Sequence, residues 1–189
     1  MNTLINIFNS YAGLLNDFCS HPITQLDFII NFERLTTKYL SQDIRFSEDF
    51  IEIFNKLSTY NEKPCIYWFD SDKELDGSLI YELINAVSKS LNLVIPAHDN
   101  KPHKSSCLYV GKVKSNIQRR LIQHLGVHKD QLRTHGLQLV HWIKNYPCRI
   151  KLHYHVVPLP QTKEWEKMAM LFEYAFSDEL KPVLGHHNG

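Results

Sequence analysis

Acidic residues are almost absent from one long segment of this 189-residue chain. Between Lys101 and Lys151 the sequence contains eleven Lys and Arg residues but a single acid, Asp130. The rest of the chain holds ten basic and nineteen acidic residues, so the formal net charge of +1 conceals a segment at +10. A solvated basic face balanced by acidic helices is the simpler interpretation, but ten unopposed charges repel one another. The imbalance therefore favours a polyanionic partner.

Long hydrophobic runs, a charged leader and paired cysteines are missing as well. The longest apolar runs fall far short of a membrane span, and MNTLINIFNSYAG lacks the charged region and cleavage site of a secretory signal. The cysteines lie about 40 residues apart, with no CxxC pair, at Cys19, Cys65, Cys107 and Cys148. We interpret them as reduced core thiols, which predicts a cytoplasmic protein without a membrane partner.

Apolar side chains are plentiful enough for a packed core. Hydrophobic residues make up 43% of the chain and include nineteen Phe and Tyr, which excludes a disordered protein. Apolar positions recur at helical spacing over residues 4–18 and 26–40, and Ser47 is placed to cap a third helix. We therefore expect an N-terminal helical region over residues 1–60, used for packing or for binding a partner, and a second domain over residues 61–189.

The pattern changes after residue 61. Pro64 precedes a short β-prone run that Asp70-Ser71-Asp72 ends as a turn, and residues 75–93 show helical spacing. Further along we expect a strand at Cys107–Val110, helices at 116–126 and 135–145, a strand over 148–159, and a helix from near Thr162 to before Pro182. The order β-α-β-α-α-β-α predicts an α+β fold.

Short motifs in this second part contain the functional signal. The strings CIY (65–67) and YVG (109–111) are followed, in order, by Lys112, Asn116, Arg120, His124, Glu173 and Pro182. Arg120 and His124 are one helical turn apart, and Pro182 lies nine residues after Glu173. Over roughly residues 61–185, this ordered set resembles the GIY-YIG nuclease superfamily. The chain departs from that pattern at Cys65, where glycine is usual, and at Gly185, where asparagine is common and for which Asn188 is a candidate substitute.

The resemblance implies a small three-stranded antiparallel sheet flanked by helices, preceded here by the N-terminal helical region. It also implies a divalent-metal-dependent endonuclease that hydrolyses phosphodiester bonds in DNA and leaves a 5′-phosphate, with Mg²⁺ or Mn²⁺ as cofactor. The catalytic residues that it implies are Tyr67, Tyr109, Lys112, Arg120 and His124, and Glu173 is the implied metal ligand. Basic residues nearby, at Lys114, Arg119, Lys129 and Arg133, are expected to bind nucleic acid through its phosphates.

Phosphodiester hydrolysis requires these types of residue. A base or positioning group for water, cations for the phosphate and usually a divalent metal must lie together before charge develops. Tyrosines on two adjacent strands can direct their hydroxyls at one spot. In the hypothesis, Tyr109 or Tyr67 orients or deprotonates the water with help from Lys112. Arg120 stabilises the phosphoryl oxygens, and Glu173 supplies the oxygen ligand that a hard cation prefers.

Some of these residues also have a purely structural explanation. Without the motif, Tyr67 and Tyr109 are typical strand aromatics. Glu173 lies in the apolar stretch MAMLFEYAF, where an unpaired carboxylate is costly. It therefore needs either a metal or a cationic partner, and a salt bridge to Arg120 satisfies the same requirement.

Two residues near the second motif, Arg120 and His124, have alternative interpretations. Arg119 competes with Arg120, but matching Asn116 and the following apolar residue to the family selects Arg120, which shares a helical face with His124. A zinc site at His124 and His128 is disfavoured, because Gly126 interrupts the helix and no cysteine or third histidine has suitable spacing. His153 and His155, two apart on a predicted strand, are expected to be surface residues.

Two other functions fit the same sequence. A catalytically impaired protein of this fold would bind nucleic acid, or a partner through its N-terminal helices, without cleaving a bond. An RNA-processing nuclease would keep the site and change the substrate. Cleavage that EDTA stops and Mn²⁺ restores separates the first from an enzyme, and matched DNA and RNA substrates separate the second.

Overall fold

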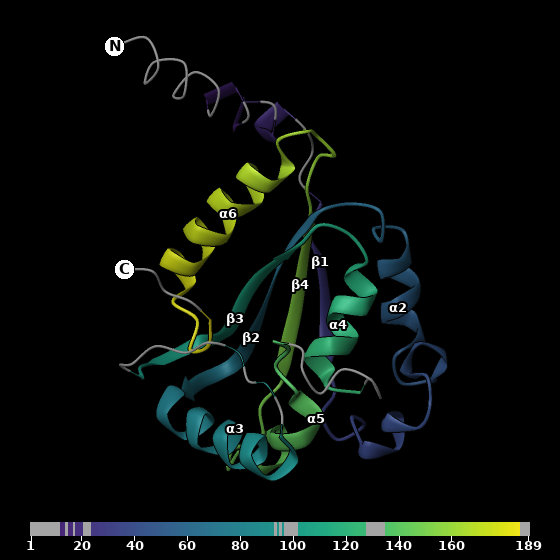
Figure 1. Cartoon of the computed structure of the whole chain (residues 1–189), viewed down its shortest axis with the longest axis vertical. Coiled ribbons are helices and arrows are strands. Elements are labelled where there is room, and N and C mark those ends of the chain that lie inside the picture. Colours follow the sequence, from purple (N-terminus) through teal and green to yellow (C-terminus); the bar gives the residue numbers. More distant parts are fainter. Residues whose placement is uncertain are drawn as a thin grey trace.

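The computed structural model describes residues 12–13, 15–16, 18–20, 24–92, 94, 96, 102–127 and 135–185. It shows an α+β fold built on one four-stranded sheet (Figure 1). The strands are β1 (Leu26–Ile30), β2 (Cys65–Asp76), β3 (Lys104–Val113) and β4 (Leu152–Pro158). Their spatial order is β1-β4-β2-β3, and every neighbouring pair is antiparallel.

Helices cover both faces of this sheet. The α-helices are α2 (Ile51–Ser58), α3 (Gly77–Leu91), α4 (Ile117–Leu125), α5 (Leu139–Trp142) and α6 (Trp165–Leu180), and the short 3₁₀ helices are η1 (Thr37–Leu40), η2 (Ile44–Phe46) and η3 (Ile143–Asn145). Because side chains alternate along a strand, Tyr67 and Phe69 of β2 face the main core with α2, α4 and α5, whereas Ile66 and Trp68 face α6. Figure 1 shows α6 on one side of the sheet and α2 and α4 on the other.

The element order predicted after residue 61 is confirmed. α3 begins where Asp76 accepts hydrogen bonds from the backbone N–H groups of Ser78 and Leu79, and it ends at Asn92 in the left-handed conformation. The predicted turn at Asp70–Asp72 is wrong, because β2 continues to Asp76 through two register shifts. Asp72 exchanges hydrogen bonds with the backbone of Lys151, which keeps this end of β2 beside the start of β4.

The helix predicted over residues 26–40 is wrong, and the sheet has one strand more than the three predicted. Residues 26–30 form β1, which pairs with β4 and buries Phe28 and Ile30 in the same core as Tyr67. Alternate burial along β1 is strand periodicity, which the apolar spacing of this short stretch does not distinguish from helical spacing. The described residues between 12 and 20 are helical. The division of the chain at residue 60 stays a prediction.

The third N-terminal helix begins later than predicted. Its N-cap is Phe50, and Ser47 instead ends η2, with its hydroxyl donating to the carbonyl of Ile44. The cysteine prediction is correct for Cys65 and Cys107, which are buried, and wrong for Cys19 and Cys148, which are exposed. In the part of the chain that the structure describes, no helix has both the length and the hydropathy needed to cross a bilayer.

Candidate active site

Four of the predicted catalytic side chains meet on the face of the sheet that α4 covers. Arg120 donates through Nε to the hydroxyl of Tyr67 at 2.7 Å, and through Nη2 to the hydroxyl of Tyr109 at 3.4 Å. The hydroxyl of Tyr67 also lies 3.0 Å from Nε2 of His124. Strands β2 and β3 and helix α4 therefore contribute to one hydrogen-bonded cluster, which we call the Tyr67 cluster (Tyr67, Tyr109, Arg120 and His124).

The ends of α4 place its two predicted site residues, Arg120 and His124. Asn116 adopts the left-handed conformation, with φ 58°, and its side chain caps the helix by accepting from the backbone N–H of Arg119. Gly126, with φ 77°, ends the helix in a conformation that favours glycine. Within this one short helix, the four-residue spacing directs Arg120 and His124 toward β2 and β3.

Gly111 makes room for the Tyr67 hydroxyl. It lies opposite Tyr67 in the β2–β3 register. A Cβ atom at this position would be 2.5 Å from the Tyr67 hydroxyl oxygen and 2.6 Å from a ring carbon of Tyr109. Only glycine fits without displacing one of the two phenols, which gives the glycine of the YVG string a physical role.

His124 is neutral and its proton position follows from its contacts. The backbone N–H of Leu137 donates to Nδ1 at 3.2 Å, so the proton of the neutral ring is on Nε2, which donates to Tyr67. Burial lowers the pKa of His124 well below 6.5, and the Arg120 charge lowers it further. Since both nitrogens are hydrogen-bonded, the ring has none left for zinc, and His128 lies outside the described residues.

Tyr67 is a neutral hydrogen-bond acceptor here rather than a base. Its side chain is completely buried, and burial raises its pKa well above 10, with the neighbouring Tyr109 and the Glu173 carboxylate acting in the same direction. Arg120 opposes this shift but does not reverse it. Of the two phenols, the partly exposed Tyr109 is the one that can reach a water molecule.

Arg120 is held by all three of its nitrogens. Besides the two phenols, Nη1 donates to the side chain of Gln123 at 3.0 Å. The guanidinium is half-buried, so its orientation is fixed before any ligand arrives. Such a group stabilises developing negative charge at little reorganisation cost.

Lys112 and Glu173 form an ion pair that joins β3 to α6. Their side chains are each 30% exposed, so the pair is accessible from solvent. The sequence analysis expected a cationic partner or a metal for Glu173, and the partner in the structure is Lys112 rather than Arg120. Lys112 is in register with Ile66, which faces α6, so the ion pair lies on the α6 side of β3 and the Tyr67 cluster lies on the α4 side. The Glu173 charge still contributes to raising the pKa of Tyr67.

The fit of these residues to a divalent metal depends on Glu173. Among the described residues, no three His, Cys, Asp or Glu side chains are grouped so as to hold a metal ion. A single carboxylate still suits Mg²⁺, which keeps several waters and often binds through one carboxylate and substrate phosphates. A metal at Glu173 would therefore need substrate phosphates as further ligands and the release of Lys112.

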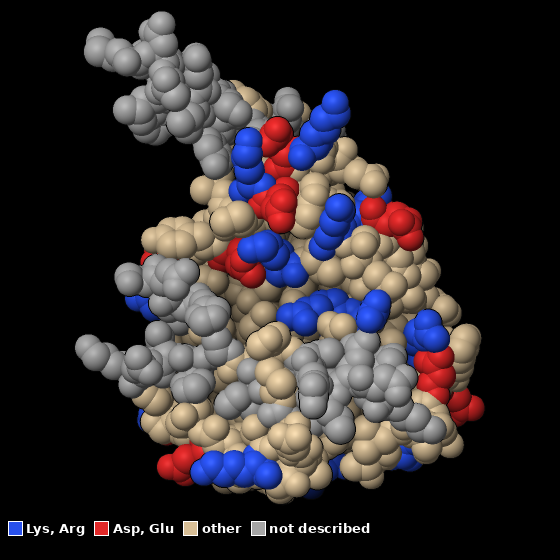
Figure 2. All heavy atoms as spheres, viewed as in Figure 1, with Lys and Arg blue, Asp and Glu red and all other residues tan. Residues whose placement is uncertain are grey.

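The predicted nucleic-acid-binding residues are only partly described. Lys114 is exposed, with its ammonium 5.9 Å from the centre of the Trp165 ring, and Arg119 is exposed on α4. Lys129, Arg133 and Asn188 lie outside the described residues. Figure 2 shows basic side chains without acidic neighbours over α4, whereas basic and acidic side chains adjoin toward α6. The basic segment is thus partly neutralised by acids from elsewhere in the chain.

Sequence reasoning missed several groups at this site. The backbone N–H of Leu137, which hydrogen-bonds His124, cannot be recognised from a sequence pattern. Gln123, which accepts from Arg120, belongs to no motif that would distinguish it from the other glutamines. Tyr154 of β4 lies beside Tyr67, with ring centres 6.0 Å apart. Its hydroxyl is buried without a hydrogen-bond partner among the described residues. The alternation of the HYHVV string was the available signal that Tyr154 faces the core.

His155 is less exposed than predicted. It lies on the α6 face of β4, stacks on Trp68 with ring centres 4.7 Å apart, and hydrogen-bonds Asp27 of β1 and Asp70 of β2. Its side chain is 13% exposed. These contacts join three strands, so the residue has a structural role.

Comparisons with protein-family models, with curated proteins and with solved structures found no match for this chain. The resemblance to the GIY-YIG superfamily thus depends on the motif residues of this chain and their arrangement alone.

Proposed function

We propose that this chain is a GIY-YIG-like endonuclease that hydrolyses phosphodiester bonds in DNA with the help of Mg²⁺ or Mn²⁺. The observation that supports the proposal is the Tyr67 cluster. Two phenols, a guanidinium and an imidazole from three separate elements form one hydrogen-bonded group. A carboxylate and an ammonium are paired across the edge strand β3, on the side of α6. Structural packing alone does not require this combination of polar groups.

The geometry supports distinct roles for these side chains. Arg120, already oriented, stabilises the charge that develops on the phosphoryl oxygens. Tyr109 positions the attacking water, because it is the more exposed phenol. Tyr67 and His124 keep Arg120 in place through hydrogen bonds, so they act as positioning residues.

Glu173 and Lys112 have linked roles in this mechanism. Glu173 would hold the divalent metal, which supplies positive charge to the departing oxygen when it is bound. Lys112, released from Glu173, then contacts a substrate phosphate. The ion pair of the free protein keeps both side chains in place until the phosphate and the metal arrive.

Nicking of supercoiled DNA by the purified chain tests the proposal. We expect cleavage with Mg²⁺ or Mn²⁺ that EDTA abolishes, and a loss of roughly 100-fold or more for Glu173→Gln or Arg120→Ala. DNA binding by Glu173→Gln should be nearly unchanged. Glu179→Gln is the matched control, since this exposed carboxylate lies on the same helix, outside the ion pair.

Unchanged nicking by Glu173→Gln would remove the metal ligand from the mechanism, and unchanged nicking by Arg120→Ala would remove the Tyr67 cluster. The same assay with RNA of matched sequence separates an RNA nuclease from a DNA nuclease.

A second function, nucleic-acid binding without hydrolysis, is favoured by one observation. In the structure Lys112 occupies the carboxylate that the metal requires. If the pair never opens, the chain binds DNA in a salt-sensitive manner but does not cut it. Binding without cleavage in any of the divalent metals would establish this function in place of the first.

A further inference from the structure

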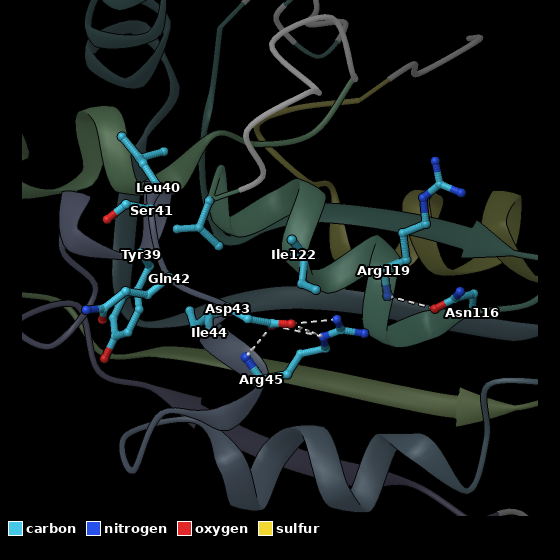
Figure 3. A pocket seen from close by; sticks show the side chains of 11 residues that line it. Tyr39, Leu40, Ser41, Gln42, Asp43, Ile44, Arg45, Asn116, Arg119 and Ile122 are labelled. Atoms are coloured by element: carbon cyan, nitrogen blue, oxygen red, sulfur yellow. Dashed lines mark hydrogen bonds and ion pairs between the residues drawn. The ribbon is translucent and has the colours of Figure 1, made fainter.

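A cavity lies on another face of α4 from the Tyr67 cluster. It has a volume of about 360 Å³, within the size range of small-ligand sites, and it is formed between η1, η2 and α4 (Figure 3). Arg120 and His124 point from α4 toward the sheet, whereas Arg119 and Ile122 line this cavity. The nuclease proposal assigns no role to it.

Arg45 of η2 is held rigidly at this cavity by Asp43. The Asp43 carboxylate accepts from the backbone N–H of Arg45 at 3.1 Å, from its Nε at 2.9 and 3.1 Å, and from its Nη2 at 2.5 Å. One edge of the guanidinium is thereby fixed. Figure 3 shows the remaining nitrogen, Nη1, pointing away from Asp43. The side chain is 47% exposed, so this nitrogen can reach a ligand.

Other donors surround the same space. Arg119 stands at the rim with its guanidinium in solvent (Figure 3). The oxygen of the Asn116 amide accepts from the backbone of Arg119, which leaves the amide nitrogen of Asn116 as a donor. Ser41 and Gln42 also line the cavity. Asp43 offsets the charge of Arg45, so the lining has a surplus of one positive charge, from Arg119.

We infer that this cavity binds one backbone phosphate of a nucleic acid, through Arg45 and Arg119, outside the cleavage centre. The inference depends on the proposed function, because the nucleic acid is the substrate proposed there. Arg119 and Arg120 are adjacent on α4, so the cavity and the proposed cleavage centre lie on neighbouring faces of one short helix. A pre-oriented guanidinium and neutral donors suit a phosphate, and contacts of this type fix the position of a strand without selecting a sequence.

Binding of a short fluorescein-labelled DNA duplex, measured by anisotropy in EDTA over a salt series, tests the inference. We expect Arg45→Gln to bind about three- to tenfold more weakly and the slope of log K against log salt to decrease by about 1. Arg34→Gln is the matched control, since Arg34 also pairs with an aspartate and is 60% exposed, but does not line the cavity.

Each result decides the matter. Equal affinity and slope for Arg45→Gln and Arg34→Gln would overturn the phosphate site, whether or not the chain cuts DNA. If Arg45→Gln weakens DNA binding, Arg34→Gln does not, and the unaltered chain does not cut DNA, the phosphate site stands and the proposed nuclease activity is rejected. A second arm titrates the chain with a 5′-mononucleotide. Binding of the mononucleotide that Arg45→Gln abolishes, with the DNA slope unchanged, would assign the cavity to a free nucleotide and overturn the inference.

Discussion

At the scale of the residue, the hydroxyl of Tyr67 connects both motif strings to α4. It receives hydrogen bonds from Arg120 and His124 and lies against the backbone of Gly111. A shift of this oxygen by a few tenths of an ångström alters two hydrogen bonds at once, because both donors come from one helix. The most sensitive position is therefore Gly111, which touches no substrate in the proposed mechanism.

Gly111→Ala should destabilise the protein by about 1–3 kcal/mol, because the new methyl group overpacks the space between Tyr67 and Tyr109. The displaced phenols should also slow DNA nicking under conditions where the variant is folded. Urea unfolding measures the first effect and the supercoiled-DNA assay the second.

Gly13→Ala is the control for this substitution, since a Cβ at Gly13 meets nothing within 4 Å. In a helical segment, alanine in place of glycine should leave stability unchanged or slightly increased. If both variants unfold at the same urea concentration, the close contact at Gly111 does not exist.

At the scale of the element, the edge strand β1 is attached by more than its backbone ladder. His155 of β4 contacts Asp27 of β1 on one side and Asp70 of β2 on the other. The ring of His153 lies 6.1 Å from that of His155. Burial alone lowers the pKa of His155, but the hydrogen bonds to Asp70 and Asp27 outweigh it, so the pKa is raised above 6.5.

The free energy of unfolding should therefore decrease as the pH rises above 6.5. A group whose pKa is raised in the folded state contributes stability that is complete below its unfolded pKa and is lost as the pH passes its folded value. Urea unfolding at a series of pH values measures this loss. His155→Gln should remove it, because glutamine does not titrate.

His153→Gln is the matched control for His155→Gln, since His153 lies on the same face of β4. It should keep the decrease in stability above pH 6.5. A decrease of the same size in the chain with His155→Gln would mean that other groups cause it.

At the scale of the whole molecule, the sequence predicted the elements that have clear end signals. Helices α3 and α4 begin at Asp76 and Asn116, whose side chains accept local hydrogen bonds, and α4 ends at Gly126 in a left-handed conformation. Because such signals are local, the order of elements after residue 61 could be predicted. β1 could not, because its five residues become a strand only by pairing with β4, more than a hundred residues away. Tertiary pairing outweighs local spacing in so short a segment.

The same distinction applies to the site. The one-turn spacing of Arg120 and His124 predicted their shared face. The pairing of Lys112 with Glu173 spans 61 residues, and the N–H of Leu137 that fixes the His124 proton belongs to the backbone. Contacts of these two kinds depend on the fold, so sequence patterns do not contain them.

Buried histidines should make the whole molecule less stable on the acid side. Burial lowers the pKa of His124 and of His141 below 6.5, so below that pH the unfolded chain binds protons that the folded chain does not. The free energy of unfolding should then fall with decreasing pH, by at most about 1.4 kcal/mol per pH unit for each histidine.

His141→Gln should reduce this slope to roughly the share of one histidine, whereas His153→Gln should not change it. Together with His155, these groups place the maximum of stability near pH 6.5. Urea unfolding that is independent of pH below 6.5 would show that these imidazoles are not buried in the neutral form.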